Sequence, residues 1–300
     1  MQLVLDPTQL NATRHALNDT GSEALIELIF RLNLGKPVDG VPTSAIELAQ
    51  ALGWIEQPPL KLTTLGYLVA DPLREYRFWI DRNRRLHSEH EYTLLARESY
   101  RSKEVLEIGC GFGCNLFSLA GLEGRFVGVE PVALYRQFTP LLAERERIQV
   151  PEVVDGRGES LPFPDNAFDV VLCYSAHQYM DIKRAVSEMA RVLRPGGQLQ
   201  IIGGTLGPYA RYVMNHVFSR TKWGSTKSHV LTLANTVSYS LLGRRLYSPR
   251  GAAATTAPIY PTVSFMHRCF AGARLRVRED LFRRVGTEAC FVAEKPAARE

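Results

Sequence analysis

The sequence predicts an α/β protein built on a doubly wound, mostly parallel sheet. The first reason is a short apolar run at residues 105–108, which leads into a glycine-rich turn and then a helical stretch. The second is the alternation of strand-like and helical stretches between residues 105 and 202, which is typical of parallel sheets with crossover helices. The third is a second apolar run, residues 126–130, that ends in an acidic residue. A ligand site is therefore expected at the carboxyl ends of these strands.

The glycine turn has the pattern G-x-G-x-G, formed by Gly109, Gly111 and Gly113. Without side chains, these residues let a ligand approach the backbone closely, and the following helix presents its N-terminus to that ligand. Glu107 lies two residues before the turn, and Glu130 ends the next strand. A carboxylate at that second position can accept hydrogen bonds from both ribose hydroxyls of a nucleoside. The turn and the two acids together predict a nucleoside-binding site.

The predicted sheet belongs to a domain at residues 101–300. Its helices and strands follow from apolar runs bounded by turn residues, and helix 181–193 should stop at Pro195-Gly196-Gly197. The expected order is strand 105–108, helix 115–120, strand 126–130, helix 132–146, strand 151–154, strand 168–174, helix 181–193 and strand 198–202.

The C-terminal part of the domain departs from this alternation. Residues 205–265 are too long for a simple crossover and are rich in aromatic residues and arginines, so we expect a mostly helical insertion over the active site. After a helix at 262–271, two strands at 274–280 and 289–295 are joined by the short stretch 283–286. So short a joint predicts an antiparallel last strand.

Charge and composition limit the classes of partner. The chain has a net charge of +5, and its last hundred residues carry 15 basic and 5 acidic side chains, which indicates either an anionic partner or a solvated basic surface. No apolar run approaches the roughly 20 residues that a membrane helix needs, and the first ten residues lack the basic start of a signal peptide. We therefore expect a cytoplasmic protein with no membrane partner. The five cysteines show no paired metal spacing, so reduced thiols and no metal are expected.

Four segments, in order, resemble the motifs of class I S-adenosylmethionine-dependent methyltransferases. They are "VLEIGCGFG", "GVEP", "GRGESLPFPDNAFDVVLCYSAH" and "EMARVLRPGGQLQII". The resemblance covers residues 104–203 and implies a Rossmann-like fold with S-adenosyl-L-methionine as cofactor. A nicotinamide dehydrogenase would also explain a glycine turn, but it would not explain "LPFPDNAFD" or the Pro-Gly-Gly stop.

The resemblance also implies roles for individual residues. Glu107 would lie near the methionine amino group of the cofactor, and Glu130 would hold the ribose hydroxyls. Pro131 and Val132 would flank the adenine. The other cofactor-binding residues that it implies are Gly109, Gly111 and Gly113 along the cofactor, Gly158, Glu159 and Ser160 at the adenine edge, and Tyr174 and Ser175 beside the sulfonium. The alternative for Glu159 and Ser160 is a simple turn.

His177 is the candidate general base, because it follows the fourth strand by a few residues and an imidazole titrates near neutral pH. The alternative is a polar or packed wall residue. Three histidines in or after the insertion are weaker rivals: His216, His229 and His267. His87 and His90, three residues apart in the linker, could share a pocket or lie on a helix surface.

Residues 1–100 are predicted to form a separate domain of helices, a small hairpin around Pro58-Pro59 and a linker helix at 72–100. This order resembles a winged-helix module. Such modules bind DNA, but in several methyltransferase families they dimerise and cover the substrate site. The region is net acidic, which argues against nucleic acid and favours a homodimer through this domain.

The sequence leaves the acceptor open. The first hypothesis is methyl transfer to a small molecule, in natural-product or secondary metabolism, with arginines such as Arg211, Arg244 and Arg245 holding an anionic group. The alternatives are an RNA or protein methyltransferase, an enzyme that uses S-adenosylmethionine without methyl transfer, such as one that catalyses intramolecular displacement on the cofactor, and a non-catalytic binding protein.

Overall fold

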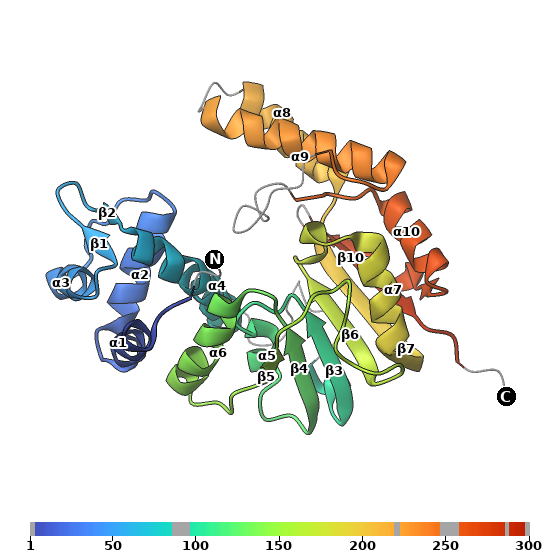
Figure 1. The fold of residues 1–300 in the computed structure, drawn as a ribbon, viewed down its shortest axis with the longest axis horizontal. Helices are drawn as coiled ribbons and strands as arrows, with labels where there is room; N and C mark the ends of the chain where they lie inside the picture. The colour runs from blue at the N-terminus through green and yellow to red at the C-terminus, as the bar shows by residue number, and fades with distance from the viewer. Residues whose placement is uncertain (1–3, 86–96, 219–222, 247–257, 286–287, 298–300) are drawn as a thin grey trace.

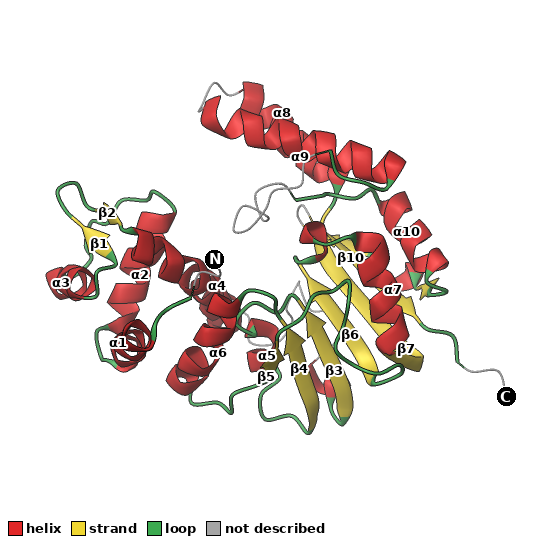
Figure 2. Cartoon of the chain, in the orientation of Figure 1, coloured by secondary structure: helices red, strands yellow, loops and turns green. Residues whose placement is uncertain are grey.

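The computed structural model describes residues 4–85, 97–218, 223–246, 258–285 and 288–297. Its centre is an eight-stranded sheet. The N-terminal helices lie on one side of it, and α7 (Ile182–Val192) and α10 (Val263–Gly272) lie on the other (Figure 1, Figure 2). The strands of this sheet are β3 (Lys103–Ile108), β4 (Gly124–Val129), β5 (Glu152–Val154), β6 (Phe168–Tyr174), β7 (Leu193–Gly204), β8 (Arg276–Val277), β9 (Arg283–Val285) and β10 (Glu288–Glu294).

The strand order confirms the predicted doubly wound sheet. The order is β5-β4-β3-β6-β7-β10-β8, with β9 also paired to β10. Strands β3 to β7 are parallel, whereas β10 runs antiparallel to β7, from Glu288 opposite Gly204 to Glu294 opposite Gln198. The order reverses between β3 and β6, and their carboxyl ends form the crevice where such sheets bind ligands.

Both faces of the sheet are buried, as continuous apolar strands require. Leu106, Val127, Val171 and Leu199 point to one face and pack in one cluster with residues of α7 (Ile182–Val192) and α10 (Val263–Gly272). Their neighbours Val105, Val170 and Leu172 point to the other face, against Tyr100, Leu119 and Leu122. The crossover helices α5 (Cys114–Ser118) and α6 (Ala133–Glu146) complete the domain.

The N-terminal region is helical, with one small hairpin. It contains α1 (Pro7–Asn18), α2 (Ser22–Asn33), α3 (Thr43–Ala51), β1 (Ile55–Glu56), β2 (Lys61–Leu62) and α4 (Thr64–Arg85). The first helix begins as its sequence indicates, because the Asp6 side chain accepts from the backbone N–H of Gln9 and the Gln9 side chain accepts from that of Asp6.

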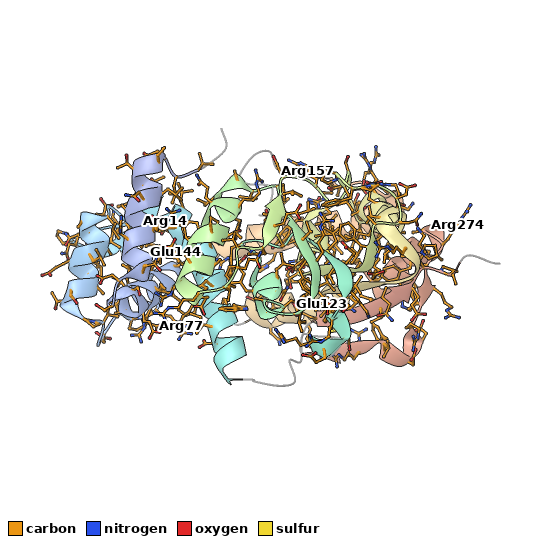
Figure 3. All side chains as sticks on the ribbon, turned by 90° about the horizontal axis from the view of Figure 1, so that it is seen from below. Arg14, Arg77, Glu123, Glu144, Arg157 and Arg274 are labelled. Carbon is orange, nitrogen blue, oxygen red and sulfur yellow. The ribbon has the colours of Figure 1, made fainter. Side chains whose placement is uncertain are left out.

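One apolar cluster joins this region to the sheet domain. Leu25 and Leu73 of the N-terminal helices are buried in the same cluster as Phe112 beside the glycine turn and Phe138 of α6. Arg14 of α1 and Glu144 of α6 also pair at 3.4 Å across this contact (Figure 3). The two parts of the chain therefore share a core, which fixes α4 beside the glycine turn.

The insertion after β7 is helical, as expected. It contains α8 (Leu206–Phe218) and α9 (Trp223–Leu242), which lie together away from the sheet, in orange in Figure 1. Across the described ranges, neither these nor the other helices combine the length and apolar character needed to cross a bilayer.

Several elements differ from the sequence-based expectation. Residues 283–285, expected in a joint, pair with residues 288–290 as β9, and only Arg276 and Val277 of the expected strand 274–280 pair with the far end of β10. Strand β10 has seven residues, so β8 and β9 can both pair with it, one at each end of the edge that faces away from β7. The expected linker helix already begins at Thr64, while His87 and His90 lie outside the described residues.

Replacing Phe138 with alanine should destabilise the protein by about 3–5 kcal/mol, because this fully buried ring packs in the shared cluster and its loss leaves a cavity. Urea denaturation would measure the change. The matched control is Tyr67→Ala on α4, where the ring is 59% exposed and the change should stay within about 0.5 kcal/mol. Equal denaturation midpoints for the two variants would contradict a shared core.

Candidate functional site

The glycine turn lies at the carboxyl end of β3 and leaves no room for side chains. Gly109 and Gly111 have φ values of +66° and +58°, a left-handed conformation that favours glycine. A Cβ atom on Gly109 would lie 2.4 Å from the Cβ of Ala176, and one on Gly111 would lie 2.8 Å from Oε2 of Glu75. The turn therefore brings bare backbone against the loop after β6 and against α4.

Glu130 connects three elements at the same edge of the sheet. It follows β4, and its two carboxylate oxygens accept from the backbone N–H groups of Gly111 at 3.0 Å and Val132 at 2.9 Å. Arg136 of α6 holds the loop by donating to the carbonyl of Glu130 at 2.5 Å and to Asp155 at 3.1 Å. Each carboxylate oxygen has a second lone pair, so Glu130 can still accept from a ligand hydroxyl.

Glu107 lies one position before the end of β3 and is buried, with 2% of its surface exposed. Its Oε1 accepts from the side-chain amide of Asn115, in the first turn of α5, at 2.5 Å. This contact links the strand to the helix that follows the glycine turn. The structure thus brings Glu107, the glycine turn and Glu130 together, as the sequence predicts.

A second group of polar side chains at this edge was not foreseen from the sequence. The Tyr135 hydroxyl of α6 lies 2.7 Å from Asp71 and 3.0 Å from Glu75, both on α4, and Arg74 pairs with Asp71 at 2.5 Å. Since Oε2 of Glu75 also faces Gly111, the N-terminal region contributes a carboxylate to the glycine turn. No sequence motif marks Glu75, because only the docking of α4 brings it there.

The two carboxylates facing Gly111 are unusually weak acids. Burial raises the pKa of Glu130 to about 7, although its two backbone hydrogen bonds oppose the shift. Burial, together with the nearby charge of Asp71, raises the pKa of Glu75 to about 7. A tyrosine hydroxyl has a single hydrogen, so a protonated Glu75 can donate the second hydrogen bond at Tyr135. A cation bound here would favour the ionised carboxylates instead.

The three residues expected at the adenine edge, Gly158, Glu159 and Ser160, lie in different surroundings. A Cβ atom on Gly158 would lie 2.5 Å from the Met180 sulfur, so its backbone packs tightly against the loop after β6. Glu159 instead accepts from the backbone N–H of Asp181 at 2.8 Å, at the start of α7. Ser160 is exposed and closes a turn with Arg157.

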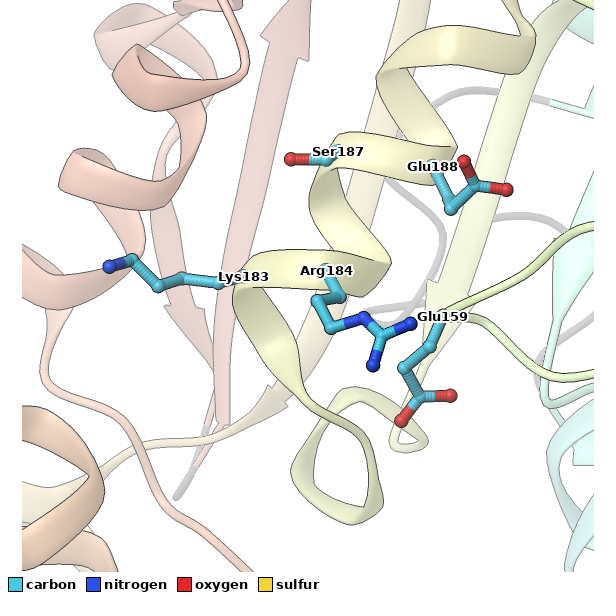
Figure 4. A pocket seen from close by; sticks show the side chains of 5 residues that line it. All are labelled: Glu159, Lys183, Arg184, Ser187 and Glu188. Carbon is cyan, nitrogen blue, oxygen red and sulfur yellow. The ribbon is translucent and has the colours of Figure 1, made fainter. Parts of the chain in front are cut away.

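Figure 4 shows a surface hollow beside Glu159 along α7. Its lining residues are Glu159, Lys183, Arg184, Ser187 and Glu188. The hollow lies beside α7 rather than at the glycine turn, and the Glu159 carboxylate already caps that helix. Contact between this side chain and an adenine would have to use the lone pairs of the carboxylate that Asp181 does not engage.

Tyr174 and Ser175 end β6, but their side chains are engaged within the protein. The Tyr174 hydroxyl donates to the Oε1 of buried Gln200 at 3.1 Å, and Tyr100 donates to the same oxygen at 2.9 Å. Ser175 has a φ of +54°, rare for a residue other than glycine, and donates to Glu288 at 3.0 Å. The backbone of this pair lies at the carboxyl edge.

His177 lies in a different environment from the one expected for a general base. It is 1% exposed, and its ring packs on the backbone of Gly203, where a Cβ atom would lie 2.4 Å from the imidazole. The backbone of Gly204 lies beside the ring and opposes the effect of burial only in part. Burial lowers the pKa of His177 to about 4, so the ring is neutral at pH 7 and a poor proton acceptor.

The other candidate side chains are spread over the insertion and α10. His229 lies 2.8 Å from the Tyr209 hydroxyl, and His267 lies 3.5 Å from Glu279, whereas the side chain of His216 lies outside the described residues. Among the arginines, Arg211 and Arg244 are exposed. The third, Arg245, donates to the carbonyls of residues 178 and 180 and so braces the loop after β6.

The free protein should lose stability as pH rises from about 4.5 to 7. The folded-state pKa values of Glu75 and Glu130, about 7, exceed the ordinary value of 4.5, so folding favours their protonated forms. That contribution is complete below pH 4.5 and is lost as pH rises through 7. Glu75→Gln should reduce the pH dependence and raise the melting temperature at pH 8 by roughly a few degrees.

Calorimetry at several pH values would measure this effect. The control is Glu123→Gln, which removes an exposed carboxylate far from the turn and should leave the profile unchanged. Parallel profiles for Glu75→Gln and the unmodified protein would show that Glu75 does not titrate as the geometry indicates.

Comparison with known proteins gives a family for the central segment. Residues 106–201 match the family model described as "Methyltransferase domain". The chain is 32% identical over 99 residues to an uncharacterised methyltransferase, YcgJ, of Bacillus subtilis, covering 33% of this chain and 39% of that protein. It is 38% identical over 98 residues to the phthiotriol/phenolphthiotriol dimycocerosates methyltransferase of Mycobacterium tuberculosis, covering 32% of this chain and 35% of that protein.

Solved structures of similar fold include the PH0226 protein of Pyrococcus horikoshii, with 16% identity, a TM-score of 0.49 and coverage of 74% of this chain and 92% of that one. The chain covers less than half the length of the two curated relatives. With the four ordered motifs and the sheet topology, the match identifies residues 106–201 as a methyltransferase domain of the class I type, an enzyme domain whose cofactor is S-adenosylmethionine.

Proposed function

We propose that this protein transfers the methyl group of S-adenosylmethionine to a small-molecule acceptor. The observation that supports this most is the bridge between Glu130 and the backbone N–H of Gly111, at the point where the strand order reverses. It places a carboxylate suited to ribose hydroxyls beside bare backbone that a ligand can approach.

The residues at this edge fit the cofactor chemically. Glu130 accepts the ribose hydroxyls through its free lone pairs, and Glu107 lies on the strand side, where an ammonium group would be neutralised. Glu75 adds a third carboxylate near the turn. When bound, S-adenosylmethionine supplies a methyl group activated by a sulfonium cation. The carboxylates would stabilise that positive charge, so we expect binding to strengthen as pH rises through 7.

In the proposed reaction the acceptor nucleophile forms a bond to the methyl carbon as the carbon–sulfur bond breaks. The acceptor's proton then passes to a base or to water. His177 remains a proposed base, but its burial and low pKa favour an acceptor that needs little help in losing its proton. The same observation favours a second candidate, S-adenosylmethionine chemistry without transfer to an acceptor, which requires no such base.

The proposed acceptor is a lipophilic small molecule with an anionic group, in natural-product or secondary metabolism. Support comes from the basic C-terminal third and from the aromatic side chains of the insertion, where the rings of Tyr209 and Tyr260 stack at 4.0 Å. The similarity to a methyltransferase named for phthiotriol dimycocerosates supports a lipophilic acceptor. An RNA or protein acceptor is less favoured, because the first hundred residues are net acidic.

The N-terminal region is proposed to cover the substrate site and to mediate a homodimer in the cytoplasm. Its winged-helix-like order of helices and a two-stranded hairpin is compatible with that role. The docking of α4 against the glycine turn supports the cover, since α4 already reaches Gly111 through Glu75.

Gly111→Ala should weaken cofactor binding at least about tenfold, because the added Cβ meets Glu75 and φ is positive. Glu130→Ala should weaken it similarly by removing the ribose acceptor. The control is Gly272→Ala at the end of α10, where a Cβ meets open space and φ is ordinary, so affinity should not change. Titration calorimetry with S-adenosylmethionine would measure all three, and unchanged affinity in both site variants would refute this placement.

Incubation with S-adenosylmethionine alone, followed by mass spectrometry, tests the reaction. We expect the cofactor to bind and stay intact until a lipophilic anionic acceptor is added, after which S-adenosylhomocysteine and a methylated product should appear together. Accumulation of methylthioadenosine without acceptor would instead establish chemistry on the cofactor itself.

A further inference from the structure

Helix α9 buries polar side chains and exposes apolar ones, which reverses the usual arrangement of an amphipathic helix. The residues that it buries are mostly polar: Thr232, Asn235, Thr236, Ser238 and Tyr239. On its outer side, Val230, Val237 and Leu241 are 57%, 48% and 78% exposed. Their spacing of seven and four residues places these three side chains on one helix face. A helix in contact with water normally shows the opposite arrangement.

The polar side of α9 is fixed by hydrogen bonds to the protein, so the orientation of the helix is well determined. Thr236 accepts from the backbone N–H of Tyr260 at 3.1 Å. The Tyr239 hydroxyl donates to Asp181, the N-cap of α7, at 2.6 Å. Turning the apolar face inward would break these contacts and leave the polar side chains of α9 without their present partners. These hydrogen bonds therefore hold the apolar face of α9 toward the outside.

The exposed apolar surface continues beyond this face. Leu242 and Leu246, at and after the end of α9, are also exposed, and Met214 on α8 is 54% exposed. Figure 1 shows α8 and α9 together at the outer end of the molecule, away from the sheet. We call Val230, Val237, Leu241, Leu242 and Leu246 the outer apolar face. Surfaces of this kind usually contact an apolar partner.

The segment of the chain that contains this face carries charge of one sign. Residues 189–278 contain 13 arginines and lysines and no aspartate or glutamate. Two of these arginines, Arg211 on α8 and Arg244 after α9, are exposed close in sequence to the apolar residues. An apolar helix face in a segment that carries exposed cationic side chains and no acidic ones has the chemistry that binds the surface of an anionic bilayer.

We propose that α8 and α9 dock on an anionic lipid bilayer, with the outer apolar face entering the interface and the neighbouring arginines contacting lipid phosphates. A second copy of this chain is a poorer occupant, because pairing two such faces would bring two acid-free, basic segments together. A nucleic acid would satisfy the arginines but would leave the leucines and valines in water. The absence of a membrane-crossing helix among the described residues is compatible with docking on the surface.

The proposal also orients the rest of the protein. Helix α8 begins two residues after β7 ends, so the insertion starts from the carboxyl edge of the sheet. The glycine turn and Glu130 lie at that same edge. Docking through α9 would bring the carboxyl edge near the lipid surface, where a lipophilic acceptor is concentrated. This last consequence rests on the proposed function, whereas the docking itself does not.

The test is sedimentation of the full chain with vesicles of phosphatidylcholine alone or phosphatidylcholine containing phosphatidylglycerol. We expect binding to the anionic vesicles that weakens as salt is raised, and little binding to the neutral ones. Val237→Gln with Leu241→Gln should lower the affinity about tenfold or more, because two inserted side chains are lost. The control is Val150→Gln, a 49% exposed valine outside the insertion, which should bind like the unmodified protein.

Three results would overturn the proposal. Equal binding of the Val237 and Leu241 double variant would show attraction by charge alone, without apolar insertion. A dimer in light scattering that the double variant abolishes, with no vesicle binding, would make a second copy the occupant. Binding to an RNA or DNA duplex in preference to anionic vesicles would assign the surface to nucleic acid. Because all substituted residues are exposed, melting curves should stay unchanged and confirm that each variant is folded.

Discussion

The carboxylate of Glu130 and the backbone N–H of Gly111 form the interaction on which the carboxyl edge depends. It ties the end of β4 to the turn after β3, and through Val132 it also fixes the start of α6. These elements can meet so closely because Gly109 and Gly111 lack side chains in a conformation that other residues adopt with strain. The cost is a buried carboxylate with a raised pKa, and a bound cation would relieve that cost.

The edge is a composite of two parts of the chain. The apolar cluster that contains Leu73 and Phe138 docks α4 on the sheet domain, and this docking carries Glu75 to the glycine turn. Any movement of the N-terminal region would therefore alter the charge around the glycine turn. Through Glu75, the N-terminal region influences the charge at the glycine turn, independently of its proposed roles in covering the substrate site and in forming a dimer.

The insertion differs from the rest of the fold in the kind of residue that it buries and exposes. Elsewhere most buried residues are apolar, whereas α9 holds Thr232, Thr236 and Tyr239 inside and leaves Val237 and Leu241 outside. A segment without acidic residues surrounds it. Only a membrane-crossing helix requires a long apolar run in the sequence. A helix of mixed composition with a single apolar face shows no such run.

The sequence alone determined the strand-turn-helix at residues 103–118, the acid at the end of β4 and the antiparallel last strand, because these features depend on local periodicity, glycine spacing and short connections. The tertiary structure decided what lies far apart along the chain: Glu75 reaches Gly111, and Glu159 caps α7. It also decided that His177, which looks like a base in the sequence, is buried against Gly203 with a pKa near 4. Burial and docking set these outcomes, and neither is encoded in a residue's immediate neighbours.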